Sequence, residues 1–323
     1  MIKIVSNTFP PELLRIEFML GNICNYKCSY CFPGSNEGDQ PWAEPEIVIK
    51  HFDHLLQHYT RYGKTKFNLY LVGGETTLWR GMEQFCAHIK SHYDISIEVS
   101  TNATRSVRWW RENGQLFDHV GISVHSEAAE PDHIISVADT LFDLGVFVNA
   151  DVLMAPDIWD RCHTNLKLLQ HSQHPWPIIA KGVYYNGSHR YTEEQLRYFD
   201  DPFKRKPPMD WYHQTHKKIP TQTVLKYSDG HSETLEGDGY LIANDLNRFL
   251  GWKCNLGVDT IKIFADGKIT GNCQQILYGA DDHYNLYAEN FVEVFAPNIQ
   301  PVICSKLICP CAKETITYKE NDQ

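Results

Sequence analysis

The sequence predicts an α/β fold in which six parallel strands form a sheet covered on both faces or part of a barrel, followed by a small cysteine-bearing module. Three observations lead to this prediction. Apolar runs of strand character alternate with amphipathic helical patterns from residue 13 to about residue 200. A cysteine triplet follows the first apolar run. Hairpin patterns and five further cysteines occupy the last part of the chain.

Each expected strand is a short apolar run, and each expected helix lies between two of them. The strands are Leu14–Leu20, Phe67–Val72, Ile95–Ser100, Val120–Val124, Val146–Met154 and Ile178–Tyr184. The helices are Glu44–Tyr62, Gly81–Tyr93, Ser106–Asn113, Asp132–Gly145 and Asp157–Ser172, with Ser106 as an N-cap and Gly145 as a stop. In such folds the chemistry lies at the C-terminal ends of the strands. The loop from Gly21 to Trp42, which carries the triplet, is therefore the first candidate site.

After about residue 205 the pattern changes from alternating strands and helices to hairpins. Thr221–Tyr227 and Thr234–Leu241 flank a turn at Asp229-Gly230. A second hairpin turns at Asp266-Gly267, with Cys254 before it and Cys273 after it. We therefore divide the chain into a barrel over residues 1–205, a linker and hairpin over 206–249, and a small module over 250–323.

Composition favours a globular protein of the cell interior. The 323 residues include 30 Lys and Arg against 40 Asp and Glu, a formal charge of −10, and 42% are hydrophobic. No run of about 18 uncharged apolar residues occurs, and the N-terminus lacks a basic-then-apolar signal pattern. We expect a cytoplasmic protein with no membrane partner. The acidic balance disfavours broad binding to nucleic acid, although it does not exclude a local basic groove.

The cysteines are grouped rather than scattered. Cys24, Cys28 and Cys31 form a C-x3-C-x2-C triplet, while Cys86 and Cys162 stand alone in helical patterns and are expected to be buried apolar residues. A structural zinc site closes a shell of four ligands, and the triplet offers three with no obvious fourth. A cubane iron–sulfur cluster has four irons, so three cysteines leave one iron open to a ligand. The triplet thus favours a catalytic cluster.

These residues resemble the radical S-adenosylmethionine superfamily, whose triplet C-x3-C-x-Tyr-C follows the first strand of a partial (β/α)6 barrel. The resemblance implies that Cys24, Cys28 and Cys31 hold a 4Fe-4S cluster whose open iron chelates S-adenosyl-L-methionine. It also implies cofactor contacts at the ends of the next strands. The residues concerned are Tyr30 beside the adenine, Gly73, Gly74 and Glu75 at the methionyl group, Ser100, Asn102 and Ser123 on the following strands, and Val152, Leu153 or Met154 as the adenine-side hydrophobe.

The sequence departs from the family pattern at two places. Ala103 stands where the segment after the third strand usually has Gly, and His125 replaces a more common Asp. An expected downstream Arg is not evident, and His125 or His133 could take its place. His125, Tyr184, Tyr185 and His189 are candidates for contact with the substrate, although half-buried packing is the stronger interpretation of each.

The C-terminal module resembles a twitch or SPASM domain, which holds auxiliary iron–sulfur clusters. The resemblance implies one auxiliary 4Fe-4S cluster with ligands from Cys254, Cys273, Cys304, Cys309 and Cys311. Five cysteines exceed the four sites of one cluster, and Cys304 is the weakest candidate. The closing pair is spaced C-x-C rather than C-x2-C, and a structural zinc site is the alternative.

The resemblance implies an enzyme that cleaves S-adenosylmethionine to a 5′-deoxyadenosyl radical, which removes hydrogen from a substrate. Oxidation or cross-linking of a peptide side chain or a small molecule is expected, with electrons from a reductant such as flavodoxin or ferredoxin. Modification of a nucleoside or nucleic-acid base is one alternative, and a non-catalytic electron-transfer module is another. Histidines such as His51, His54 and His58 are expected to be solvated, and Trp109-Trp110 to be core.

Overall fold

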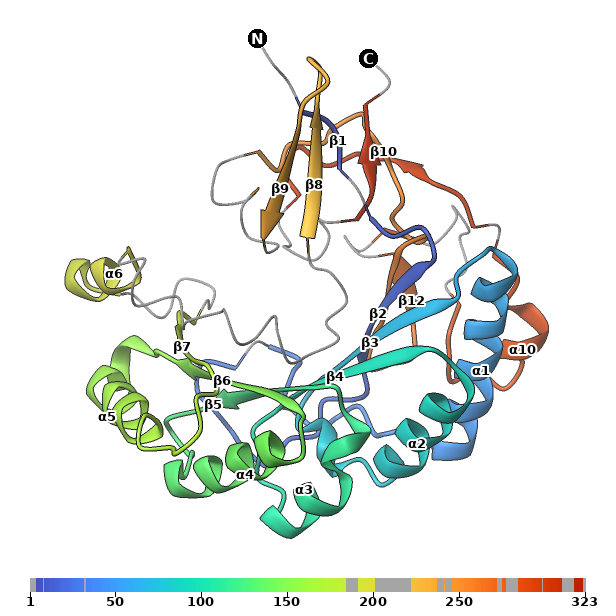
Figure 1. Ribbon diagram of the computed structural model, residues 1–323. Coiled ribbons are helices and arrows are strands. Elements are labelled where there is room, and N and C mark those ends of the chain that lie inside the picture. The colour runs from blue at the N-terminus through green and yellow to red at the C-terminus, as the bar shows by residue number, and fades with distance from the viewer. Residues whose placement is uncertain are drawn as a thin grey trace.

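The protein is described by a computed structural model over residues 4–7, 9–31, 33–183, 191–200, 222–236, 241, 246–271, 275–276, 284–297, 299–309 and 317–321. These residues form two sheets (Figure 1). The larger has nine strands in the order β13-β12-β11-β2-β3-β4-β5-β6-β7. The smaller has six strands in the order β14-β10-β15-β1-β8-β9.

Six parallel strands form the body of the larger sheet, as the alternating pattern predicts. They are β2 (Leu13–Met19), β3 (Lys66–Val72), β4 (Ile95–Thr101), β5 (His119–Val124), β6 (Phe147–Leu153) and β7 (Ile178–Lys181). No closing ladder between β7 and β2 occurs among the described residues, so the sheet is an open, partial barrel. The α/β fold class predicted from the sequence is confirmed.

The helices that connect these strands pack on one face of the curved sheet (Figure 1). They are α1 (Pro45–Arg61), α2 (Met82–His92), α3 (Val107–Asn113), α4 (Pro131–Asp143) and α5 (Trp159–Leu169), with short 3-10 turns at Thr76–Leu78, Gly114–Leu116 and Pro156–Ile158. Ser106 caps α3 as predicted, because its side chain accepts a hydrogen bond from the Trp109 amide. Phe18 of β2 stacks on Phe52 of α1 at 6.0 Å in the core between the layers.

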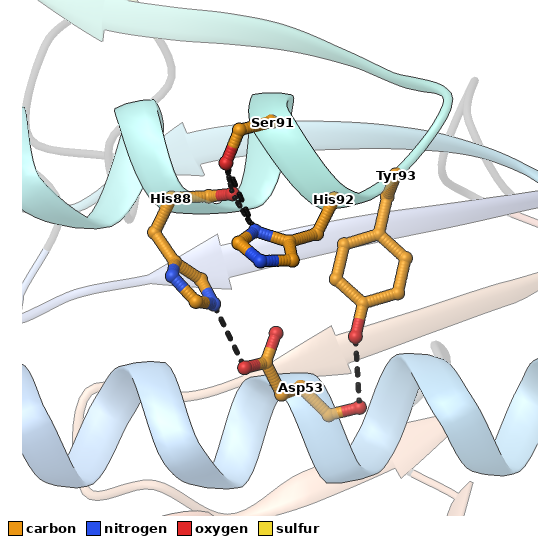
Figure 2. Close-up of polar contacts among 5 residues, drawn as sticks. All are labelled: Asp53, His88, Ser91, His92 and Tyr93. Atoms are coloured by element: carbon orange, nitrogen blue, oxygen red, sulfur yellow. Dashed lines mark hydrogen bonds and ion pairs between the residues drawn. The ribbon is translucent and has the colours of Figure 1, made fainter.

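Polar contacts between the middle of α1 and the C-terminal end of α2 fix these two helices against each other (Figure 2). His88 Nε2 lies 2.8 Å from the Asp53 carboxylate, and the Tyr93 hydroxyl donates to the Asp53 carbonyl oxygen. The His88 and His92 rings stack at 4.3 Å. Trp110 is fully buried and Trp109 packs against the core, as predicted.

The C-terminal region extends the larger sheet instead of standing apart from it. Strand β11 (Thr260–Ile263) pairs in parallel with β2, and β12 (Ile269–Gly271) and β13 (Gln275–Ile276) follow as antiparallel strands. The predicted hairpin around Asp266-Gly267 is therefore β11–β12. Its first strand occupies the open edge beside β2.

The smaller sheet joins segments from both ends of the chain. It contains β1 (Ile4–Asn7), β8 (Gln222–Tyr227), β9 (Ser232–Glu236), β10 (Lys253–Cys254), β14 (Val302–Ile303) and β15 (Lys319–Glu320). Strands β8 and β9 are the hairpin predicted around Asp229-Gly230. Strand β1 was not predicted from the sequence. A further helix, α6 (Glu193–Asp200), and the single turn α10 (Phe291–Val294) complete the described elements.

The expectation that the histidines of α1 are solvated is wrong. His51 and His58 are 3% and 7% exposed, and their rings lie 2.6 Å from the Leu286 and 2.9 Å from the Pro297 carbonyl oxygens. His54 Nε2 lies 3.4 Å from the Phe295 carbonyl oxygen. These three histidines fasten the segment 284–297 to the outside of α1.

We predict that the buried ion pair between Lys64 and Asp259 is a major contact between the barrel and β11. The Lys64 ammonium lies 2.7 Å from the Asp259 carboxylate, and both side chains are at most 3% exposed. Lys64→Met leaves a buried carboxylate without its cation and should lower the free energy of unfolding by about 3–5 kcal/mol. Urea unfolding measured by circular dichroism checks this value.

The exposed pair of Lys66 and Glu12 provides the control for this prediction. These charges lie 3.4 Å apart with side chains 56% and 39% exposed, so Lys66→Met should cost less than about 1 kcal/mol. Equal losses for the two variants would contradict the assignment of Lys64.

Candidate functional site

A cavity at the C-terminal edge of the parallel strands brings together most of the site residues predicted for the barrel. It is lined by Cys24, Tyr26, Cys28, Cys31, Ser35, Asn36, Gly73, Gly74, Ser100, Thr101, Asn102, Ser123 and His125. The lining residues lie at or just after the C-terminal ends of β2, β3, β4 and β5, the strands whose ends the sequence singled out. Tyr26, Ser35, Asn36 and Thr101 were not predicted as site residues, although the first three lie in the loop that carries the triplet and Thr101 lies between Ser100 and Asn102.

Backbone contacts hold the loop after β3 against the loop that carries the triplet. The Gly74 amide donates to the Gly21 carbonyl oxygen at 3.0 Å, and the Glu75 amide donates to the Ile23 carbonyl oxygen at 2.8 Å. A Cβ on Gly73, where φ is +141°, would lie 2.3 Å from the Gly21 oxygen. A Cβ on Gly74 would lie 2.2 Å from the Ile23 oxygen. Only glycine permits this approach.

Glu75 is a buried acceptor that connects the ends of β3 and β4. Its side chain is 0% exposed and accepts hydrogen bonds from the Thr77 amide and hydroxyl, the Thr101 hydroxyl at 2.7 Å, and the Asn102 amide at 2.5 Å. Burial raises the pKa of Glu75, while these four donors act in the opposite direction. The carboxylate lies beneath the cavity rather than on its surface, and its predicted contact with a cofactor stays a prediction.

Asn102 links the end of β4 to the first cysteine of the triplet. Its Nδ2 donates to Asn25 Oδ1 at 2.9 Å and lies 3.9 Å from Cys24 Sγ, and the Tyr26 amide donates to the same sulfur at 3.3 Å. Ala103, at the usual Gly position, has φ +60°, the single positive φ of a non-glycine residue in the described ranges. The family's preference for Gly here therefore has a conformational reason. His133 supports this bend, because its Nε2 lies 3.0 Å from the Ala103 carbonyl oxygen.

Aromatic rings form one wall of the cavity. The His125 ring stacks on Tyr30 at 5.9 Å and meets the edge of Tyr26 at 6.2 Å. Burial lowers the pKa of His125 to about 4, so its imidazole is neutral near pH 7. Tyr30 itself lies behind this wall and is 4% exposed. On the outside, the Ser29 amide donates to the Glu127 carboxylate at 2.8 Å, which fixes the triplet loop to the loop after β5.

The three thiols of the triplet share this cavity, and burial favours the protonated form of Cys24 and Cys28. Burial raises the pKa of Cys28 to about 12, with the Glu127 charge adding to the effect, and burial also raises the pKa of Cys24. Across the described ranges, no group of three His, Cys, Asp or Glu side chains is arranged to hold a single metal ion. Thiols must lose their protons before they bind a metal, so loading a metal centre here would release protons.

A second group of cysteines lies around the smaller sheet. Cys309 is buried with Leu225, Leu241 and Phe249, and Cys304 packs against the same group. Burial raises the pKa of the Cys254 thiol, the Lys319 charge opposes this change, and Cys304 and Cys309 reinforce it. Cys304, the weakest candidate by sequence, thus lies in the same electrostatic neighbourhood as Cys254 and Cys309. Cys273 and Cys311 lie outside the described residues.

The remaining predicted residues fall into four groups. Ser100 and Ser123 lie side by side in the cavity, with their hydroxyl oxygens 3.4 Å apart. Met154, like Val152, is fully buried, and neither lines the cavity. Tyr184, Tyr185 and His189 lie outside the described residues. Cys86 and Cys162 are completely buried, which confirms their interpretation as core residues.

The donor chemistry of the cavity fits an iron–sulfur cluster with an organic ligand beside it. Thiolates are the ligands that iron–sulfur clusters use, and a cubane places each cysteine on a different iron. Gly73 and Gly74 line the same cavity with bare backbone, and Ser100, Thr101, Asn102 and Ser123 supply neutral hydrogen-bonding groups along one side. Cys24, Cys28 and Cys31 would hold the cluster.

We predict that Gly74→Ala disrupts the triplet loop. The added methyl group would overlap the Ile23 carbonyl, one residue before Cys24, and overpacking of this kind costs about 1–3 kcal/mol or more. Iron retained after reconstitution under anaerobic conditions should fall relative to the wild type. Gly121→Ala is the control, since its Cβ would meet no atom closer than 3.7 Å and should leave the iron content unchanged. Full iron retention by Gly74→Ala would contradict this role.

Comparison with curated proteins finds similarity over part of the chain to enzymes named for reactions of nucleotides. The chain is 26% identical over 143 residues to GTP 3′,8-cyclase of Edwardsiella ictaluri, covering 43% of this chain and 42% of that protein. It is 29% identical over 118 residues to an S-adenosylmethionine-dependent nucleotide dehydratase of a Fibrobacter species, covering 36% of this chain and 34% of that protein. The match spans less than half the length of either relative.

Comparison with solved structures supports the fold. anSMEcpe with bound AdoMet superposes with a TM-score of 0.51 at 16% identity, covering 88% of this chain and 81% of that one. Streptococcus suis SuiB bound to S-adenosylmethionine superposes with a TM-score of 0.51 at 14% identity, covering 88% and 66%. Residues 18–141, which include the triplet and the ends of β2 to β5, match the family model described as Radical SAM superfamily. Residues 18–141 therefore match a radical SAM superfamily domain.

Proposed function

We propose that the chain is a radical enzyme that holds a 4Fe-4S cluster on Cys24, Cys28 and Cys31 and cleaves S-adenosylmethionine there. The observation that carries the proposal is the shared cavity of the three thiols, closed on one side by Gly73 and Gly74. The family match over residues 18–141 supports it. The cluster, when bound, would supply the electron that splits the cofactor into methionine and a 5′-deoxyadenosyl radical.

In this proposed function, the protein binds the cofactor, orients it and shields the radical from water. Bare backbone at Gly73 and Gly74 offers amide and carbonyl groups to the methionyl end of a ligand, and Asn102, Ser100 and Ser123 offer side-chain groups to its polar remainder. Glu75 holds the Asn102 backbone in place from below. The neutral His125 ring, stacked on Tyr30, gives the cavity an aromatic wall. These groups would orient the radical toward one C–H bond and exclude water.

We further propose an auxiliary 4Fe-4S cluster on cysteines of the C-terminal region. Cys254, Cys304 and Cys309 gather at the smaller sheet, and Cys273 and Cys311 are the other candidate ligands. Such a centre suits a reaction that removes an electron from the substrate, and it favours oxidation or cross-linking. A reductant such as flavodoxin or ferredoxin in the cytoplasm would supply the electron for cofactor cleavage. In the described ranges, no helix is both long and apolar enough to cross a membrane.

For the substrate we propose a peptide side chain or a small molecule, with a nucleotide as the second candidate. The likeness of this fold to anSMEcpe and SuiB agrees with either class, because it concerns the fold alone. The nucleotide candidate is favoured by the curated relatives, both of which are named for reactions of nucleotides. Acceleration of 5′-deoxyadenosine release by GTP or CTP, measured by liquid chromatography against a peptide panel, would distinguish the two.

We predict that the triplet accounts for half of the iron in the reconstituted protein. Because each cubane contains four irons, wild type should bind about eight irons per chain, and a Cys24/Cys28/Cys31→Ala variant about four. After reduction with dithionite, only the wild type should convert S-adenosylmethionine to 5′-deoxyadenosine. Iron and sulfide assays, with chromatography of the nucleoside product, give these values.

Cys86→Ala and Cys162→Ala are matched controls, because both cysteines are fully buried in α2 and α5 and neither lines the cavity. Their iron content should equal that of the wild type. Intact clusters without 5′-deoxyadenosine from the reduced wild type would refute the catalytic proposal and leave the electron-transfer alternative. Zinc in place of iron in the triplet variant would support the structural zinc alternative for the C-terminal group.

A further inference from the structure

Lys319 is a buried cation within the C-terminal region. Its side chain is 1% exposed, although lysine is among the residues that proteins bury least. The ammonium donates to the Thr317 carbonyl oxygen at 3.0 Å and lies 5.0 Å from the centre of the Phe249 ring. Asn7 of β1 fixes this segment, since its Oδ1 accepts from the Lys319 amide and its Nδ2 donates to the Thr317 carbonyl oxygen at 2.9 Å. The position of the charge is therefore set by the fold.

The register of the smaller sheet places Lys319 directly opposite Cys254. Strands β10 and β15 pair antiparallel, with Cys254 aligned to Lys319 and Lys253 aligned to Glu320. Directly opposed residues in an antiparallel pair project to the same face of the sheet. Cys254 and Lys319 therefore share the buried face, with Cys254 5% exposed, while Lys253 and Glu320 form an ion pair at 2.6 Å on the other face.

The remaining described cysteines of this region adjoin the same core. Phe249, whose ring faces the Lys319 ammonium, is buried together with Cys309, and Cys304 packs against this group. The Cys304 amide donates to the Trp252 carbonyl oxygen, and the Cys309 amide donates to the Asn247 carbonyl oxygen. Backbone contacts thus hold both cysteines near β10.

We propose that the Lys319 ammonium stabilises the reduced state of the auxiliary cluster and so raises its reduction potential. The inference rests on the proposed function, which assigns that cluster to these cysteines. Thiolates give such a centre a net negative charge, and reduction adds one more electron. Net charge is one of the factors that set the potential of an iron–sulfur cluster. A fixed cation in a buried site interacts strongly with that added charge, because little water screens it.

The experiment uses the full chain with the triplet removed, Cys24/Cys28/Cys31→Ala, so that every iron signal arises from the auxiliary cluster. Lys319→Met is introduced into this background, and the potential is measured by a mediated titration with detection by electron paramagnetic resonance. At the midpoint potential of the parent, the ratio of reduced to oxidised cluster should fall at least about tenfold in Lys319→Met. A tenfold change corresponds to ~59 mV for a one-electron couple.

Three further variants separate charge from folding. Lys319→Arg keeps the charge and should retain the parent potential, whereas Lys319→Gln should shift it as Lys319→Met does. Lys253→Met removes a cation from the same strand pair, but from the face opposite Cys254, and should leave the potential unchanged. Circular dichroism identifies the neutral variants that fold, and either one suffices.

The outcomes distinguish this inference from the function on which it rests. Full iron occupancy with an unchanged potential in a folded neutral variant would overturn the role of Lys319 and leave the auxiliary cluster intact. An equal shift in Lys253→Met would overturn it as well. Loss of iron from the folded Lys319→Gln variant, with retention by Lys319→Arg, would still support a role of the charge toward the cluster. Absence of iron from the parent would refute the auxiliary cluster, and this inference with it.

Discussion

The candidate site depends on the backbone contact between the loop after β2 and the loop after β3. The Gly74 and Glu75 amides continue the parallel pairing of β2 with β3 beyond the ends of the strands, and they hold the chain just before Cys24. This contact needs two residues without side chains, since a Cβ at either glycine would overlap a backbone carbonyl of the triplet loop. Glu75 connects this contact to β4, because its carboxylate accepts hydrogen bonds from Thr101 and Asn102. A loop rich in polar and small residues thereby acquires a fixed backbone.

The parallel strands and the helices between them could be predicted because their signals are local. A run such as Leu14–Leu20 and the periodic pattern of Glu44–Tyr62 agree with the observed β2 and α1 to within one residue at each end. The smaller sheet could not be predicted in the same way. Its strands β10, β14 and β15 are two residues long, too short to show a period, and β1 pairs with segments more than 200 residues away. Such pairing is decided by tertiary contacts rather than by local preference.

The functional and buried polar residues also divide into those with a local sequence signal and those placed by contacts with distant segments. The triplet and the glycine pair carry spacing and residue type that point to their chemistry, and the structure brings both to one cavity. The histidines of α1 carry no such signal, because a helix position facing solvent and one facing a distant segment look alike in sequence. His51 and His58 are buried by residues 286 and 297, which follow them by more than 230 positions. The bend at Ala103 could not be predicted from the local sequence either, because alanine rarely adopts the positive φ that it has here.

The two cysteine groups differ in the sign of the charge buried next to them. Glu75 lies below the triplet and acts on Cys24 to favour the protonated thiol, whereas Lys319 acts on Cys254 in the opposite direction. For two clusters held as proposed, an ionised Glu75 would oppose the addition of an electron at the first, and Lys319 would favour it at the second. In the proposed reaction the first centre would give an electron to a cofactor that is hard to reduce, and the second would accept one from the substrate radical. With Glu75 ionised, the two buried charges would bias each proposed centre toward the electron transfer that the proposed reaction requires of it.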